Sequence, residues 1–463
     1  MTCVKGMQLL VDCPCLWLIP KRSRNHYWIA YEMSTLTVAN DIKRRDLLKI
    51  VIAASLVNGL ELFDFTVFGF FAAAIGDQFS PATNPMTSLL LAVGTFGVGF
   101  FMRPLGAIMI GAYADRVGRR AAITMTSWMM ALGTAAVGVC PPFATIGIAA
   151  PLIVIAGRLL QGFAAGGEMG AAATFVMEAG PMSRRGNLVS WQLASQGAAA
   201  LLGASLGMLL TRTMTPASLA AWGWRIPFLI GLLVLPVGLY VRHRLREIPL
   251  PVGSGNSGRH VGTPLAELCR HHGMTILLAT LMIMGRTVPV YAIVLYMPSY
   301  LTRVMHMPAM TGFLCSAVSA LLLVVISPLS GMLADRLPRR KPLVLFASGC
   351  TALLVYPLFL MITRAHNAWS VLCGVGVISI LLALGAGAST LLVLEALPVR
   401  VRASGLSISY ATGVALFGGT AQFIVTGLIK WTGNPMSVVW YVAPSCLLSF
   451  LAVVLFKEQP AEI

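Results

Sequence analysis

Long apolar stretches separated by short polar ones run along almost the whole chain. Each stretch holds about 20 or more predominantly apolar residues, the length that a helix needs to cross a bilayer. Several are longer, as tilted helices are. We predict twelve membrane-spanning helices, at residues 48–77, 86–114, 121–141, 148–178, 188–211, 222–242, 274–302, 310–334, 343–364, 368–396, 404–430 and 436–457.

The composition supports an all-α membrane protein. Only 11% of the residues are charged and the mean hydropathy is +0.82, whereas a soluble domain carries about 25% charged residues. The nine cysteines are scattered without a CxxC pair, so we predict no metal site. There is no HExxH or P-loop sequence, and we predict neither an enzyme nor a cofactor. Any energy for transport must then come from an ion gradient.

The net charge of +17 is distributed unevenly. Most basic residues fall on one set of alternating loops, and the other set holds only Arg212, Arg303, Arg364 and Lys430. Basic loops face the cytoplasm, so we predict that both termini are cytoplasmic. The basic patches then face lipid headgroups, and nucleic acid is not an expected partner. We expect a monomer in a bacterial inner membrane.

One polar interval, about 243–273, divides the predicted spans six and six. It contains "LPVGSGNSGRH", which is typical of a linker. We therefore predict an N-terminal extension (1–45), a six-helix bundle (46–242), a cytoplasmic linker (243–273) and a second bundle (274–463). Residues 1–32 precede an ordinary polar lead that begins at Met33, where we expect natural translation to start.

The two predicted bundles share short motifs. "GAYADRVGRR" at 111–120 recurs as "GMLADRLPRR" at 331–340, and "EAGPMSRR" at 178–185 recurs as "EALPVRVR" at 395–402. Both pairs occupy matching loops, after the second and fourth span of each half. Six spans per half give both halves the same orientation, as parallel repeats require.

These motifs carry a resemblance to a known family. G-x-x-x-D-R-x-G-R-R after the second span, with a weaker copy after the eighth, resembles the signature of the major facilitator superfamily. Other motifs resemble its metabolite–proton symporters, and most of all the citrate and tricarballylate symporters: "NGLELFDFTVFG" (58–69), "FFMRPLGA" (100–107), "GRLLQGFAAGGEMG" (157–170), "WGWRIPFLIG" (222–231) and "FGGT" (417–420). The resemblance implies two six-helix halves and a transport function.

Asp115 stands at the C-terminal end of its predicted helix, where the helix dipole disfavours an anion. It pairs either locally with Arg116 or Arg119, or across the halves with the start of the eleventh span near Ser404. The resemblance implies the second arrangement, a latch at the cytoplasmic side. The predicted gating residues are Gly111, Asp115, Arg116, Gly118, Arg119, Arg120, Asp335 and Arg336. Pro338 replaces a glycine in the second copy, so a scaffold role is the expectation there.

Five charged residues lie deep in the predicted spans, where ionisable side chains are costly and usually functional. They are Glu61, Asp64, Arg103, Arg158 and Arg286. Asn58, Glu61 and Asp64 follow one another at intervals of three, so they share a broad helix face. Two carboxyls that close repel each other when both are charged, which suits proton coupling. The alternative for each carboxyl is simple neutralisation of an arginine.

The surplus of deep arginine suits an anionic substrate, because guanidinium binds carboxylate in a bidentate fork. We predict substrate binding by Arg103, Arg158 and Arg286, with Gln161, Gln192 and Gln196 adding hydrogen bonds. For the two glutamines of the fifth span, helix–helix contact is the alternative. Arg286 departs from the citrate-type pattern, which carries small hydroxyl residues there. This departure favours a different or more highly charged carboxylate.

The sequence therefore predicts a secondary transporter that imports a small di- or tricarboxylate, such as citrate, with protons. A proton symporter for betaine or proline, or for shikimate or an aromatic acid, is the alternative within the family. From other classes, a membrane-embedded enzyme would need a catalytic cluster that the chain lacks, and a channel would not need the latch.

Overall fold

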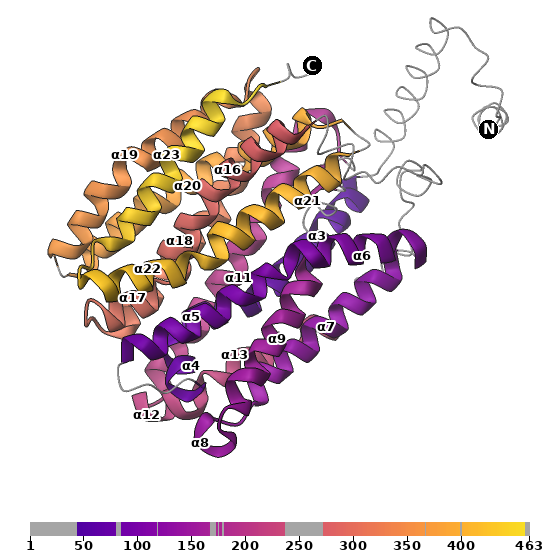
Figure 1. The fold of residues 1–463 in the computed structure, drawn as a ribbon. Helices are drawn as coiled ribbons and strands as arrows, with labels where there is room; N and C mark the ends of the chain where they lie inside the picture. Colours follow the sequence, from indigo (N-terminus) through magenta and orange to yellow (C-terminus); the bar gives the residue numbers. More distant parts are fainter. Residues whose placement is uncertain are drawn as a thin grey trace, which may run out of the picture.

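The computed structural model is helical throughout the part of the chain that it describes. This part comprises residues 44–79, 85–117, 119–166, 173–174, 176–177, 180–236, 272–365, 367–398 and 401–458. The N-terminal half contains α3 (Arg44–Phe70), α4 (Ala72–Phe79), α5 (Pro85–Phe101), α6 (Arg103–Val117), α7 (Arg119–Val139), α8 (Phe143–Ile146), α9 (Ala149–Ala165), α11 (Arg185–Thr213), α12 (Pro216–Ser218) and α13 (Arg225–Gly231). The C-terminal half contains α16 (Gly273–Pro289), α17 (Met297–Arg303), α18 (Ala309–Arg336), α19 (Lys341–Ala365), α20 (Ala368–Ala396), α21 (Arg402–Gly413), α22 (Gly419–Thr432) and α23 (Ser437–Leu455). Figure 1 shows the two halves as neighbouring bundles of elongated helices.

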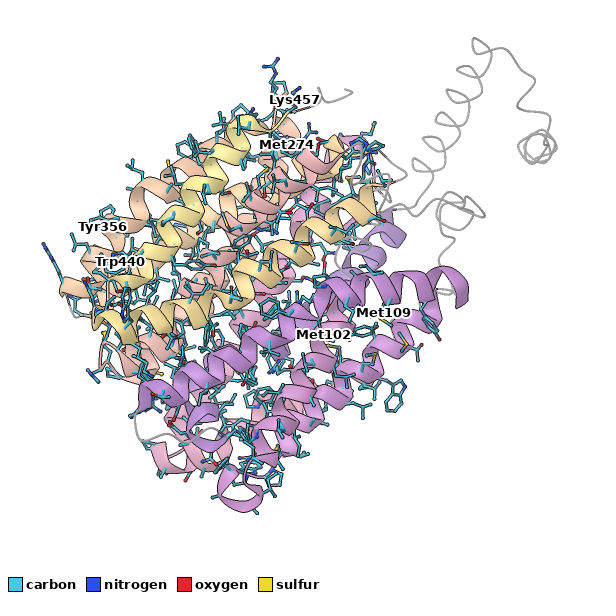
Figure 2. All side chains as sticks on the ribbon, in the orientation of Figure 1. Met102, Met109, Met274, Tyr356, Trp440 and Lys457 are labelled. Atoms are coloured by element: carbon cyan, nitrogen blue, oxygen red, sulfur yellow. The ribbon has the colours of Figure 1, made fainter. Side chains whose placement is uncertain are left out.

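The helices account for the predicted membrane spans. Within the described residues, nine helices are long and apolar enough to cross a membrane, and the bent pair of α3 and α4 brings the number to ten. The third and fourth predicted spans correspond to α7 and to α9, a shorter apolar helix of 17 residues. Large apolar side chains face outward, among them Leu353 and Leu132, which are 75% and 57% exposed, and many more surround both bundles (Figure 2). The prediction of an all-α membrane protein is confirmed.

Several predicted spans are broken rather than continuous. The first bends by 67° between Phe70 and Ala72. The seventh ends its α-helix at Pro289, continues as a π-helical turn (η6, Val290–Leu295), and resumes as α17. Proline has no backbone N–H to continue the helical ladder, which explains this break. The eleventh carries a similar π-helical turn between α21 and α22 (η7, Val414–Gly418). Irregular backbone at membrane depth is tolerated where it is buried in protein or lines a cavity.

The halves meet along two helix pairs with small residues at the contact. Along the first pair, α11 packs on α18: a Cβ on Gly197 would lie 3.0 Å from the carbonyl oxygen of Ala320, and one on Gly186 would lie 2.8 Å from that of Gly331. Along the second, α5 packs on α22, where a Cβ on Gly97 would lie 3.1 Å from the oxygen of Gly419. Small residues allow such close approach of helices in membranes.

The two ends of the molecule differ in charge. One end, which we call the basic end, carries Arg184, Arg336, Arg339 and Lys457. The other end, which we call the opposite end, is closed by contacts between the halves. Arg303 of α17 pairs with Asp77 of α4. Lys430 of α22 donates a hydrogen bond to Thr87 of α5 at 2.9 Å. The predicted linker lies outside the described residues except for its last two positions, as does most of the N-terminal extension.

Aromatic rings reinforce the closure of the opposite end. The ring of Phe313 on α18 packs against Phe70 at 6.1 Å and against Phe71 at 5.4 Å between centroids. Deeper in the molecule, Tyr291 of η6 packs against Phe96 and Phe100 of α5. These contacts join the halves between the opposite end and the centre, so that any solute at the centre is shielded from that side.

Candidate substrate site

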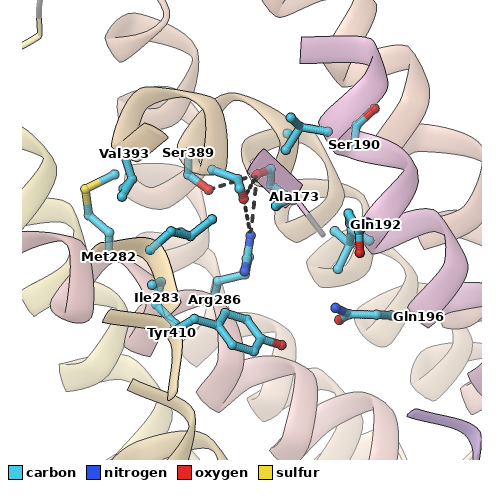
Figure 3. Close-up of a pocket in the computed structure, with 16 residues that line it drawn as sticks. Ala173, Ser190, Gln192, Gln196, Met282, Ile283, Arg286, Ser389, Val393 and Tyr410 are labelled. Carbon is cyan, nitrogen blue, oxygen red and sulfur yellow. Dashed lines mark hydrogen bonds between the residues drawn. The ribbon is translucent and has the colours of Figure 1, made fainter. Parts of the chain in front are cut away.

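A pocket lies between the halves, on the side of the molecule toward the basic end. Four helices supply its walls, α11 from the first half and α16, α20 and α21 from the second, together with Ala173. Figure 3 shows how these side chains converge on a common space. The lining residues are Ala173, Val189, Ser190, Gln192, Leu193, Gln196, Met282, Ile283, Arg286, Ala386, Gly387, Ser389, Thr390, Val393, Leu406 and Tyr410.

Arg286 supplies the charge in this pocket. It sits on α16 one turn before Pro289, and its Nη1 donates to the hydroxyl of Thr390 at 2.9 Å and to the carbonyl of Ala386 at 3.5 Å. Its guanidinium makes no ion pair with a carboxylate in the described part of the chain. A guanidinium in that situation retains donors for an incoming carboxylate. In Figure 3 the Tyr410 ring lies beside it.

The wall opposite Arg286 is formed by α11. Gln192 and Gln196 point from this helix toward the pocket (Figure 3). The Gln192 side chain is buried, yet neither its Oε1 nor its Nε2 has a hydrogen-bond partner among the described residues. Buried amides are nearly always hydrogen-bonded, so this pair of atoms is suited to a ligand. Asn58 fixes α11 at this level, because its Nδ2 donates to the Gln192 carbonyl at 3.0 Å and to the Ser195 hydroxyl at 2.7 Å.

Arg158 lies outside the pocket lining, in a buried network of the first half. Its Nη1 pairs with Asp64 Oδ2 at 3.0 Å, and both side chains are almost completely buried. Gln161 Nε2 donates to the same carboxylate oxygen at 2.6 Å and to the Thr134 hydroxyl at 2.9 Å. The guanidinium also lies 4.0 Å from the centroid of the Phe68 ring, a favourable cation–π contact. Asp64 therefore neutralises Arg158 in this conformation.

Arg103 and Glu61 form a looser pair. Arg103 Nη2 lies 3.8 Å from Glu61 Oε1, which is longer than a hydrogen bond. The guanidinium stacks on the rings of Phe100, at 4.5 Å, and Phe65, at 4.7 Å. Phe100 in turn contacts Tyr291 of the second half. The Arg103–Glu61 pair is therefore linked, through Phe100, to a residue of the second half.

The structure brings together some of the predicted binding residues and separates others. Arg286, Gln192 and Gln196 line one pocket. Arg103, Arg158 and Gln161 lie in the first half with the two carboxyls predicted for protons, and none of them is in the pocket lining. Sequence reasoning missed Thr390 and Tyr410, because a hydroxyl in an apolar span carries no signal of what it faces.

A family model, Major Facilitator Superfamily, matches residues 54–421. The chain belongs to the major facilitator superfamily. A citrate-proton symporter of Klebsiella pneumoniae is 35% identical over 408 residues, covering 87% of this chain and 90% of the relative. A glycine betaine/proline/ectoine/pipecolic acid transporter of Dickeya dadantii is 31% identical over 444 residues, covering 92% and 86%.

Solved structures give the same fold. The xylose transporter of Escherichia coli in a partially occluded inward-open conformation matches with a TM-score of 0.72 at 17% identity, covering 89% of this chain and 98% of that chain. The motif-based recognition is confirmed, and the protein is a multi-pass membrane transporter rather than an enzyme.

The superfamily signature repeats occupy the basic end. In the second copy, Asp335 crosses to the other half: Oδ1 accepts from the backbone N–H of Gly186 at 2.6 Å and Oδ2 from that of Asn187 at 2.8 Å. These are free donors in the first turn of α11, where the helix dipole favours an anion. The copy in which we expected a scaffold role thus joins the halves. Arg336 beside it is exposed.

The first copy cannot be compared in the same way. Gly118 and the side chains of Asp115, Arg116, Arg119 and Arg120, together with Gly111, lie outside the described residues. The helices that carry them, α6 and α7, do belong to the described part, and α6 packs against α21 of the other half. The predicted latch between Asp115 and the start of the eleventh span stays a prediction.

Proposed function

We propose that this transporter is a proton-coupled symporter that imports a small di- or tricarboxylate, such as citrate, by alternating access. The observation that carries the proposal is Arg286, a guanidinium in a pocket between the halves that no described carboxylate neutralises. A site of this kind at the interface of two repeats is where such transporters bind substrate. The similarity to a citrate-proton symporter supports an organic acid as the substrate.

The site geometry supports alternating access. The opposite end is closed by Arg303–Asp77 and by the Phe313 contacts, while the pocket lies on the basic-end side of these rings. The basic loops favour a cytoplasmic location for the basic end, and hence cytoplasmic termini in a bacterial inner membrane. In the conformation described, the substrate site would then be shielded from the outside.

Glu61 and Asp64 are the proposed proton carriers, and their surroundings differ. Asp64 accepts hydrogen bonds at one oxygen from Arg158, at 3.0 Å, and from Gln161, at 2.6 Å, so it serves as the counter-ion of a buried guanidinium. Glu61 lies 3.8 Å from Arg103, near the ring of Phe100 that contacts the second half. We assign the exchangeable proton to Glu61 and a supporting role to Asp64.

A second candidate substrate is a zwitterionic osmolyte, which the similarity to the glycine betaine/proline/ectoine/pipecolic acid transporter favours. The Tyr410 ring beside Arg286 is suited to a quaternary ammonium group. However, the described lining contains no carboxylate to pair with an ammonium. Shikimate or an aromatic acid would also find one guanidinium and an apolar wall.

Uptake into proteoliposomes tests the proposal. An imposed inward proton gradient should drive accumulation of citrate, tricarballylate, 2-oxoglutarate or shikimate. Without an imposed gradient, adding the pH-adjusted substrate outside should raise the external pH, because protons enter the liposomes with it. Betaine is tested in the same panel. Accumulation of betaine but of no acid would replace the first candidate by the second, and uptake that is insensitive to the proton gradient would reject symport.

A further inference from the structure

The pocket has an unusual charge balance for a site that receives a polyanion. Within its described lining, Arg286 is the single charged side chain, and no carboxylate or second cation stands beside it. The other polar groups are neutral: Ser190, Gln192, Gln196, Ser389, Thr390 and Tyr410. The rest of the lining is apolar, including Met282, Ile283, Val393 and Leu406.

The other two deep arginines do not add to this charge. Arg158 is held by Asp64 at 3.0 Å, and Arg103 lies 3.8 Å from Glu61. Each guanidinium is also stacked on phenylalanine rings of the first half. Withdrawing Arg158 toward the pocket would leave the buried Asp64 carboxylate without its counter-ion, which is strongly unfavourable.

One guanidinium neutralises one carboxylate. A second ionised carboxylate in the same pocket would lose its water and gain only neutral partners, and an uncompensated buried charge takes up a proton instead. The Gln192 amide is suited to this outcome. Its Oε1 and Nε2 both lack partners, so it offers one acceptor and one donor side by side. A protonated carboxyl, or a hydroxyl, presents the complementary donor and acceptor.

We propose that the pocket binds its substrate with a single ionised carboxylate, held by Arg286, while the amides of α11 receive a neutral carboxyl or hydroxyl group. The substrate is thus a hydroxylated monocarboxylate, or a di- or tricarboxylic acid whose other carboxyls are protonated. This inference rests on the proposed function in that it takes an organic acid as the occupant. Part of the proton flux then travels on the substrate itself.

Few protein groups near Arg286 can imitate this dependence on pH. The described titratable side chains on the elements packed around it are Tyr410 of α21, Tyr291 of η6, Tyr441 and Cys446 of α23, and Cys373 and Glu395 of α20. Glu395 lies outside the pocket lining and pairs with Arg340 at 3.2 Å. Phenols and thiols do not ionise between pH 5 and 7. Glu61 and Asp64 lie in the first half, and their titration would affect every acid equally.

Equilibrium binding to the purified full-length protein separates these contributions. Citrate and a hydroxylated monocarboxylate such as gluconate are titrated calorimetrically between pH 5 and 7. We expect the Kd for total citrate to rise more than about ten-fold over this range, because its ionised carboxyls increase. Recalculated on the singly ionised species, that Kd should stay constant, and the Kd for gluconate should not change.

Other outcomes overturn the inference. A citrate Kd that is constant or falls with pH would show that the polyanion itself binds. A gluconate Kd that rises as steeply as that of citrate would assign the pH dependence to the protein. No binding of any organic acid at any pH would instead contradict the proposed function, so the two failures are distinguishable.

A variant with a second positive charge tests whether the single guanidinium limits the pocket to one ionised carboxylate. Gln196 faces Arg286 across the pocket (Figure 3), so Gln196→Arg supplies a second guanidinium and Gln196→Glu is the matched change of opposite sign. We expect Gln196→Arg to reduce the ratio of the citrate Kd at pH 7 to that at pH 5 by at least about ten-fold. Gln196→Glu should weaken the binding of both acids at both pH values. An unchanged ratio in a folded Gln196→Arg protein would overturn the inference.

Discussion

Two deeply buried guanidinium groups of the first half rest on phenylalanine rings. Arg158 lies over Phe68 and Arg103 lies over Phe100. The rings satisfy the flat faces of the guanidinium groups, while Asp64 and Glu61 lie near their edges. Arg286 instead lies beside hydroxyls and an open pocket. The same residue type is thus neutralised internally in the first half, whereas at the interface we propose that it binds the ligand.

The sequence did not indicate which buried carboxylate pairs with which arginine. Counting residues within each span placed five charges deep in the predicted spans, and four of them, Glu61, Asp64, Arg103 and Arg158, are buried. Which acid meets which arginine did not follow, because Asp64 and Arg158 are 94 residues apart and helix rotation decides the contact. Asn58, Glu61 and Asp64 in fact turn toward three different helices, α11, α6 and α9.

The Asp64–Arg158 pair yields a stability prediction. Asp64→Asn removes the counter-ion of a completely buried guanidinium and should lower the free energy of unfolding by about 3–5 kcal/mol. The double variant Asp64→Asn/Arg158→Gln leaves no buried charge and should recover part of this loss. Denaturation of the purified protein in detergent measures both. A single variant as stable as the wild type would show that the pair is not neutralising.

Glu61 yields a prediction about coupling. Glu61→Gln keeps the shape of the side chain but cannot release a proton, so gradient-driven accumulation should fall to the part whose protons travel on the substrate. Exchange of labelled for unlabelled substrate needs no net proton movement and should persist. Counterflow in proteoliposomes measures exchange. Undiminished gradient-driven accumulation by Glu61→Gln would remove Glu61 from the coupling mechanism.

At the scale of elements, the sequence predicted the spans well and their breaks poorly. The seventh predicted span, 274–302, became α16, a π-helical turn and α17. Pro289 signalled a disturbance, but not that the turn would be π-helical or that Arg286 would stand just before it. The eleventh span broke without any proline, at Val414–Gly418, where only glycines give a hint. The small residues of α11 were a better guide, since they do mark the seam with α18.

That seam yields a prediction about conformational equilibrium. Asp335 caps the first turn of α11 from the other half. Asp335→Ala therefore removes two hydrogen bonds that exist only while the two halves are in contact at the basic end. A lost cap costs about 0.5–2 kcal/mol, which corresponds to a shift of up to about 30-fold toward conformations open at this end. Spin-label distances between α11 and α18 report the shift. Arg336→Ala, an exposed neighbour, is the matched control, and equal distance distributions in both variants would contradict the role of Asp335.

For the whole molecule, the alternating access that we propose requires the opposite end to separate. Arg303 and Asp77 join α17 to α4 there, although they are 226 residues apart in the chain. The division into two six-helix halves was readable from the repeated motifs. The sequence did not indicate which end is closed, because the conformations closed at either end have the same sequence and differ only in how the halves tilt.

Cross-linking the opposite end tests this motion. In a protein without other cysteines, Asp77→Cys/Arg303→Cys should form a disulfide under oxidising conditions and lose uptake, and reduction should restore it. Substrate binding from the basic end should survive the cross-link. Asp77→Cys alone controls for loss of the ion pair. Undiminished uptake by the fully cross-linked protein would mean that this end does not open.

The most direct measurement is the affinity of Arg286→Gln for the organic acid that we propose as the substrate. Arg286 is the charged side chain of the described pocket lining, and losing one partner of a buried charge pair costs about 2–5 kcal/mol. We expect the Kd to rise at least about 30-fold, with Arg364→Gln, an exposed residue at the end of α19, binding as the wild type does. Unchanged affinity in a folded Arg286→Gln protein would contradict carboxylate binding in this pocket.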